Sequence, residues 1–157
     1  KISIKDIRYL YIKNSTILFM NILFLCVGNS ARSQIAEGLA KEMLGSDHNI
    51  QSAGSMPTGK IHPGAFKIMK DIGIDISGQS SKSIDDLDKD FINKLDYVIT
   101  LCAEEVCPFV PSKAKMINWA NEDPAKNNYN EKQSEAIFKQ TRENIYKLLK
   151  TFLILNT

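Results

Sequence analysis

The residues that most clearly suggest chemistry are a cysteine and an arginine six positions apart, Cys26 and Arg32. The apolar run of residues 22–25 stops at the cysteine, and a helical pattern starts at Ser33. A loop between a strand and a helix turns successive backbone N–H groups toward one point, where the helix N-terminus adds partial positive charge. The guanidinium of Arg32 can hold two oxygens of a tetrahedral anion. We therefore expect an oxyanion site in which Cys26 faces the bound anion as a thiolate nucleophile.

The loop itself contains residue types suited to a tight anion cradle. Gly28 and Asn29 tolerate left-handed backbone, and the hydroxyl of Ser33 can donate a hydrogen bond to the Cys26 sulfur. The structural alternative is a buried cysteine at a strand end followed by a surface arginine. The residues predicted to bind the oxyanion are Val27, Gly28, Asn29, Ser30, Ala31 and Ser33.

Two further cysteines follow a second apolar run. Cys102 directly follows the apolar run of residues 97–101, and Cys107 lies in a loop bounded by prolines. An odd total of 3 cysteines and no early signal-peptide pattern predict thiols in a reducing cytoplasm rather than a disulfide scaffold. Taken singly, each residue could instead be buried filler or an incidental surface thiol.

Composition and charge give no support for a nucleic-acid or membrane partner. The chain has 157 residues, 43% hydrophobic and 24% charged, with a net charge of +2. Such a charge, without a basic run, does not favour nucleic acid or an anionic membrane, and no apolar run approaches the roughly 20 residues that span a bilayer. His48 and His62 lack a Cys-x2-Cys partner, so we expect surface histidines, no metal site and no cofactor.

Alternating strand and helix patterns predict the fold. Strands are expected at residues 22–25, 49–53, 97–101 and 115–119, and helices at 33–44 (capped by Ser33 and stopped by Gly45), 62–73, 83–95 (capped by Ser83 with Asp86) and a closing helix through Ala136 and Phe152. This order predicts an α/β protein with a small doubly wound, four-stranded parallel sheet and helices on both faces, for which we take the strand order 2-1-3-4. Residues 1–19 are expected to be an N-terminal extension and residues 20–157 a single domain.

That strand order has a consequence for the site. In a doubly wound sheet, ligands bind beyond the carboxyl ends of the strands, where the strand order reverses. We therefore expect the loops after Leu25 and Leu101 to be neighbours there.

The segment from Cys26 to Glu37 resembles the active-site loop of the low-molecular-weight protein tyrosine phosphatases and of the thioredoxin-coupled arsenate reductases that share their fold. Gln34 and residues 51–54, 73–77, 100–102 and 123–125 are more similar to the reductase branch. The resemblance covers about residues 20–155 and implies a phosphatase-like fold.

The resemblance also implies a thiol relay. Cys102 would attack the adduct of Cys26 with arsenic, Cys107 would then attack Cys102, and a thioredoxin-like protein would reduce the resulting Cys102–Cys107 disulfide. Asp123 would be the general acid, with Glu122 as the second candidate and a turn-forming Asp-Pro as the structural alternative. The short Cys-x4-Cys spacing departs from many relatives and suggests a glutaredoxin-type reductant as another possibility. Ala31 stands where many relatives have a further cysteine.

Some reductases of this branch hold potassium through residues that correspond to Asn29, Glu37, Ser52 and an aspartate, which is Lys82 here. We expect the Lys82 ammonium to replace that ion by pairing with Glu37. Two other functions stay open. One is a low-molecular-weight tyrosine phosphatase that acts through a phosphocysteine at Cys26, and the other is a non-catalytic oxyanion- or phosphotyrosine-binding module.

Overall fold

The computed structural model describes Lys5, residues 18–103 and residues 106–156. Most of the predicted N-terminal extension lies outside the described residues, so its boundary at residue 20 stays a prediction. The described elements are, in order, β1 (Asn21–Cys26), α2 (Arg32–Leu44), β2 (Asn49–Gly54), α3 (Pro63–Lys70), the single-turn 3-10 helix η1 (Ile84–Asp86), α4 (Lys89–Asn93), β3 (Tyr97–Thr100), β4 (Lys115–Asn118) and α5 (Glu131–Leu155).

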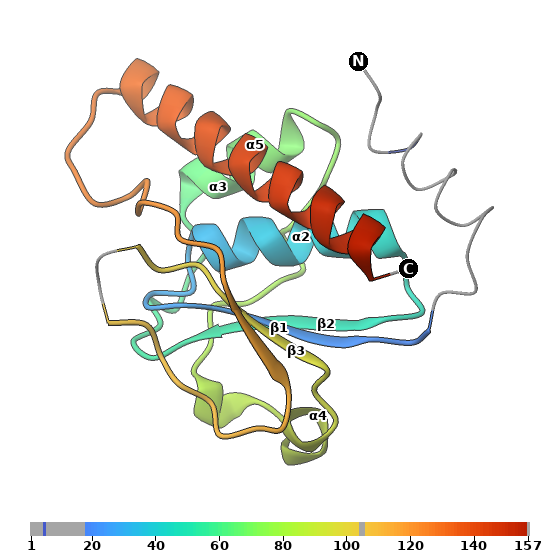
Figure 1. Cartoon of the computed structure of the whole chain (residues 1–157). Helices are drawn as coiled ribbons and strands as arrows, with labels where there is room; N and C mark the ends of the chain where they lie inside the picture. Colours follow the sequence, from blue (N-terminus) through green and yellow to red (C-terminus); the bar gives the residue numbers. More distant parts are fainter. Residues whose placement is uncertain (1–4, 6–17, 104–105, 157) are drawn as a thin grey trace.

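The four strands form one parallel sheet in the order β2-β1-β3-β4, which confirms the predicted doubly wound α/β fold. The helices α2, α3 and α5 cover one face, while η1 and α4 lie against the other (Figure 1). All of β1 is buried because its side chains point alternately to the two faces of the sheet and both faces are covered. Phe24 packs beneath α2 and α5, whereas Leu25 packs with Phe91 of α4.

The carboxyl ends of β1 and β3 lie side by side. In the register of this strand pair Leu25 is opposite Thr100, and just beyond the pair the Leu101 N–H donates to the Leu25 carbonyl at 2.9 Å. The predicted proximity of the loops after Leu25 and Leu101 is therefore confirmed, and Cys26 and Cys102 follow these neighbouring strand ends.

Some helix boundaries differ from the prediction. Ser33 is not the cap of α2, because the helix starts one residue earlier, after Ala31, and has no side-chain cap. The predicted stop at Gly45 is confirmed, with a left-handed φ of 85°. The Ser83 capping box is present, but it caps only η1, and the separate helix α4 has its own cap at Asp88.

The remaining helices begin with polar caps. His62 caps α3, which ends at Lys70, short of the predicted end at residue 73. Asn130 and Gln133 form a capping box at the start of α5, whose buried face includes Phe138 and Leu149. Among the described residues, no helix is long and apolar enough to cross a membrane.

Candidate functional site

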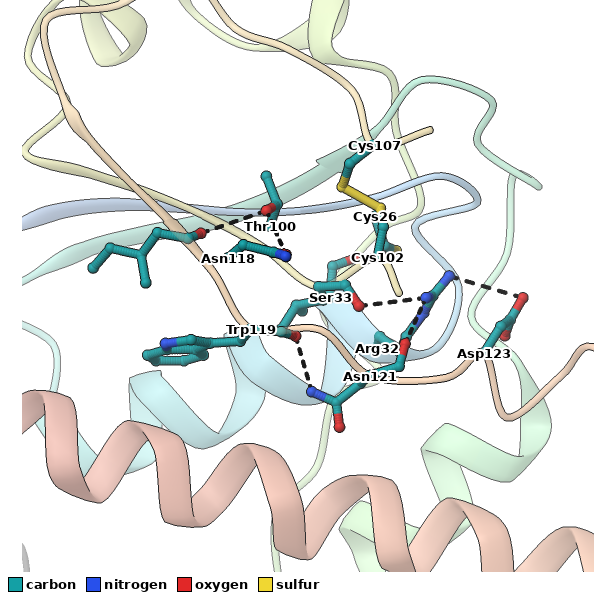
Figure 2. The surroundings of a disulfide bond; sticks show 12 residues. Cys26, Arg32, Ser33, Thr100, Cys102, Cys107, Asn118, Trp119, Asn121 and Asp123 are labelled. Atoms are coloured by element: carbon teal, nitrogen blue, oxygen red, sulfur yellow. Dashed lines mark hydrogen bonds and ion pairs between the residues drawn. A yellow bond between two sulfur atoms is a disulfide. The ribbon is translucent and has the colours of Figure 1, made fainter. Parts of the chain in front are cut away.

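The Cys26 thiol is buried at the end of β1, with an exposed fraction of 2%. Its Sγ lies 2.8 Å from the Ser33 Oγ (Figure 2). That same oxygen accepts a hydrogen bond from the Asn29 Nδ2 at 2.8 Å, so the Ser33 hydroxyl proton is free to point at the sulfur. The Ser33 hydroxyl therefore lies where it can donate a hydrogen bond to the Cys26 sulfur.

Asn29 fixes the shape of the loop. It is fully buried and adopts the left-handed backbone expected for it, with φ of 46°, whereas Gly28 does not. Its Nδ2 also donates to the Ser52 Oγ at 2.9 Å, and its Oδ1 accepts from the Lys82 N–H at 2.9 Å. Because a backbone N–H can only donate, this last bond fixes which side-chain atom is the oxygen.

The carbonyl oxygens of loop residues 27–30 all accept hydrogen bonds from neighbouring segments. Within the part of the chain that the structure describes, the backbone N–H groups of residues 28–31 donate to no other group. The loop is therefore held from its outer side, and its N–H groups stay available to an anion. The donors to the carbonyls of residues 27, 28, 29 and 30 are Met56 N, Thr58 N, Gln34 Nε2 and His62 N, at 2.9, 3.0, 3.0 and 2.9 Å.

Arg32 is buried rather than at the surface, with an exposed fraction of 3%. One terminal nitrogen donates to the Leu101 carbonyl at 3.3 Å and to the Asn121 carbonyl at 2.9 Å (Figure 2). These carbonyls follow β3 and β4, so the guanidinium is fixed by the two strand-end loops. The alternative of a surface arginine is therefore wrong.

Asp123 faces this arginine from the loop after β4. Its Oδ2 lies 3.9 Å from the second terminal nitrogen of Arg32 (Figure 2), and its Oδ1 accepts from the Ala125 N–H at 3.0 Å. The side chain is 39% exposed, so its carboxylate is in contact with water. Glu122 is exposed, and among the described residues it makes no hydrogen bond or ion pair with the site.

Cys102 and Cys107 form a disulfide beside Cys26 (Figure 2). Their Cα atoms are 5.5 Å apart, so the short spacing between them is long enough for the bond to close. Cys102 is buried, with an exposed fraction of 3%, whereas Cys107 is only half-buried. The two cysteines that the sequence left open as possible filler are thus paired at the same sheet edge as the Cys26 thiol.

The direct ion pair expected between Lys82 and Glu37 is absent among the described residues. Lys41 makes it instead, with its Nζ 2.9 Å from the Glu37 Oε2. The Lys82 Nζ donates to the Ser80 carbonyl at 3.3 Å, and burial lowers the Lys82 pKa while the charge of Glu37 opposes that shift. Two ammonium groups thus already balance the buried carboxylate. This donor set does not fit the potassium site implied by the resemblance, although the Glu37 Oε1 itself has no hydrogen-bond partner.

The histidines are half-buried rather than freely exposed. His62 accepts the Gly64 N–H at its Nδ1, 2.9 Å away, and stacks on Phe138. Burial lowers the His62 pKa, while the charge of Asp123 opposes the shift. Across the described residues, no group of three or more His, Cys, Asp or Glu side chains could hold a metal ion.

Sequence reasoning missed two glutamines behind the loop. The Gln34 Nε2 donates to the Asn29 carbonyl and to the Ser80 carbonyl, both at 3.0 Å. The Gln79 Nε2 donates in turn to the Gln34 carbonyl at 3.0 Å and to its Oε1 at 2.8 Å. The sequence marks Gln34 only through the resemblance, and no local pattern marks Gln79, because its partner Gln34 is far away in the chain.

Comparisons with known proteins agree with this geometry. The family model described as "Low molecular weight phosphotyrosine protein phosphatase" matches residues 21–156. An arsenate reductase of Halalkalibacterium halodurans is 45% identical over 133 residues, which are 83% of this chain and 93% of that protein.

Solved structures give the same result. A structure described as an arsenate reductase in the phosphate binding state has a TM-score of 0.73 and 29% identity, and the match covers 88% of this chain and 100% of that one. A thioredoxin-dependent arsenate reductase of Corynebacterium glutamicum has a TM-score of 0.65 and 28% identity, with 98% of this chain and 71% of that one covered.

Proposed function

The chain belongs to the low molecular weight phosphotyrosine protein phosphatase family, and from this premise we propose that it is an arsenate reductase that uses Cys26, Cys102 and Cys107 in turn. The observation that carries the proposal is the Cys102–Cys107 disulfide beside the Cys26 thiol. A phosphatase needs one nucleophile, an anion-binding arginine and an acid, and has no use for two more thiols. Reduction of arsenate needs them, because two electrons must leave the protein.

Binding of the oxyanion uses the loop and Arg32. The N–H groups of residues 28–31 and the guanidinium donate to the arsenate oxygens, and the buried setting strengthens these bonds. The Cys26 thiolate, stabilised by the Ser33 hydroxyl, attacks arsenic and forms a sulfur–arsenic bond. Asp123 protonates the departing oxygen, which leaves as water.

The relay then moves the oxidation away from Cys26. The Cys102 thiolate attacks the Cys26 sulfur, so a disulfide forms and the sulfur–arsenic bond breaks. The electron pair of that bond stays on arsenic, which leaves as arsenite. The Cys107 thiolate next attacks the Cys102 sulfur, forms the Cys102–Cys107 disulfide and returns Cys26 as a thiolate. The structure contains the disulfide with which this sequence ends.

An external reductant must then reopen the disulfide. A thioredoxin-type dithiol protein is the reductant we propose, since the Corynebacterium glutamicum neighbour is thioredoxin-dependent. A glutaredoxin-type protein is the alternative. Either reductant works in a reducing compartment, so we propose the cytoplasm as the location.

The test compares wild type with Cys26→Ser and Cys102→Ser. Arsenate reduction is followed through NADPH consumption with thioredoxin and thioredoxin reductase, and aryl phosphate hydrolysis is measured on the same samples. Both variants should lose arsenate reduction. Only Cys26→Ser should lose phosphate hydrolysis, because Cys102 takes no part in that reaction.

A phosphatase side activity is the second candidate function, and the shared placement of Cys26, Arg32 and Asp123 favours it. Turnover of aryl phosphate by a wild type that does not reduce arsenate would make the phosphatase the main activity. Anion binding that is equal in wild type and Cys26→Ser, with neither activity in wild type, would instead identify a binding module.

A further inference from the structure

Two large apolar side chains next to the disulfide are exposed to solvent. Val106, directly before Cys107, is 92% exposed, and Phe109, two residues after it, is 72% exposed. The next residue, Val110, is 2% exposed and packs in the core with Leu25. The loop is therefore anchored at Val110, while the side chains on either side of Cys107 contribute little to the core. Apolar side chains exposed on both sides of a reactive cysteine offer a surface against which a partner protein can pack.

The two cysteines of the disulfide differ in exposure. Cys102 is buried and Cys107 is half-buried, so we expect an incoming thiolate to attack the Cys107 sulfur. Any protein that brings a thiolate to Cys107 must also cover the residues on both sides of it. The loop thus combines a disulfide, the more exposed cysteine Cys107, and the exposed apolar side chains of Val106 and Phe109 on either side of it.

We propose that Val106 and Phe109 form the docking surface for the thioredoxin-type dithiol protein that reduces the Cys102–Cys107 disulfide. This inference rests on the proposed function. Exposed apolar side chains favour a protein with an apolar surface around its dithiol over a small charged thiol such as glutathione, which has little apolar area to cover them.

The reaction at this surface is a two-step exchange. A thiolate of the partner attacks the Cys107 sulfur, forms a mixed disulfide with it and breaks the Cys102–Cys107 bond, and the released Cys102 thiolate takes up a proton. The second thiolate of the partner then attacks the partner's first sulfur, which is bonded to Cys107, and releases Cys107 as a thiolate. The partner is oxidised to its disulfide, and two electrons and two protons pass to the cysteines of this chain.

The chain offers a matched control near the opposite end of the strands. Ile154 and Leu155, at the end of α5, are 64% and 77% exposed. The next residue, Asn156, accepts a hydrogen bond from the Tyr97 hydroxyl, and Tyr97 is the first residue of β3, whereas the disulfide follows the last. Loss of apolar area at Ile154 and Leu155 should therefore leave the partner's access to Cys107 unchanged.

The experiment uses the double variants Val106→Ser/Phe109→Ser and Ile154→Ser/Leu155→Ser. Reduction of the disulfide in the full chain is timed with reduced thioredoxin and, separately, with dithiothreitol, in the absence of arsenate. For the first variant we expect kcat/KM with thioredoxin to fall about tenfold or more, mainly through KM, as for truncated interface hot spots. The rate with dithiothreitol, and both rates of the control variant, should match wild type.

The outcomes separate this inference from the proposed function. An unchanged rate with thioredoxin, or an equal fall with dithiothreitol, would overturn the docking surface, and so would a wild-type disulfide that thioredoxin does not reduce. Failure of the proposed function would show in another assay. In that case wild type would not reduce arsenate even with dithiothreitol, while the disulfide kinetics would still report on docking.

Discussion

Asn29 is the residue whose replacement tests the architecture of the loop most directly. It is fully buried, has a left-handed backbone and makes three side-chain hydrogen bonds, to Ser33, Ser52 and the Lys82 N–H. Asn29→Ala removes all three bonds at once and leaves their partners in a buried setting. It also leaves alanine in a left-handed backbone conformation, which the polar side chain of asparagine tolerates better.

The structure gives the size of the effect. Each lost bond costs about 1 kcal/mol of unfolding free energy, more where the partner finds no water. The left-handed conformation adds about 1 kcal/mol for alanine. We therefore expect Asn29→Ala to lower the unfolding free energy by about 4 kcal/mol, a large share of the roughly 5–15 kcal/mol of an ordinary domain. Asn29→Gly loses the same bonds without the backbone strain, so its loss should be about 1 kcal/mol smaller.

Urea unfolding of the reduced protein measures these differences. The single tryptophan, Trp119, is a suitable probe because it is buried against Phe24 of β1, with ring centroids 6.1 Å apart. The control is Asn128→Ala, at an exposed asparagine, which should change stability by less than about 0.5 kcal/mol. A loss below about 1 kcal/mol for Asn29→Ala would refute the reasoning, and equal losses for alanine and glycine would refute the strain component.

Two other changes probe the surroundings of the loop. A Cβ at Gly54 would clash with the Val27 carbonyl oxygen and lie 3.0 Å from the Asn29 N. Gly54→Ala should therefore weaken phosphate binding and lower the unfolding free energy, measured in urea, by about 2 kcal/mol or more. Gly78→Ala is the control and should change neither, because the space around Gly78 is open. Burial lowers the His62 pKa, so the unfolded chain binds this proton more readily, and stability should fall as pH drops from the ordinary value of 6.5 through the folded pKa. His62→Asn keeps a helix cap and should flatten the fall in the urea midpoint as the pH drops below 6.5. An equally steep fall in the variant would contradict the assignment.

Much of the fold could be predicted because it depends on short-range patterns. The buried run of β1, the stop at Gly45 and the capping box at Ser83 are local signals, and the structure contains all three. The parallel sheet with helices on both faces followed from the alternation of strand and helix patterns, and its strands lie in the assumed order. The errors arose where tertiary partners compete with local ones. Ser33 looks like a helix cap, but its hydroxyl is taken by Cys26 and Asn29.

The same competition explains the ion pair around Glu37. A correspondence along the sequence pointed to Lys82, yet Lys41 lies one helical turn from Glu37 on α2 and makes the bond. Gln79 gave no signal at all, because its role exists only once the connecting segment lies against α2.

The sequence by itself determined the chemistry that the loop can offer. A strand, a cysteine, a turn and an arginine at the start of a helix are contiguous, so the backbone alone brings the thiol to the anion-binding N–H groups. The tertiary structure decided which residues from distant parts of the chain join this loop. Only the pairing of β1 with β3 places Cys102 beside Cys26, and only the loops after β3 and β4 hold Arg32 in its buried position. Contacts of that kind join residues some seventy or more positions apart, and no local pattern encodes them.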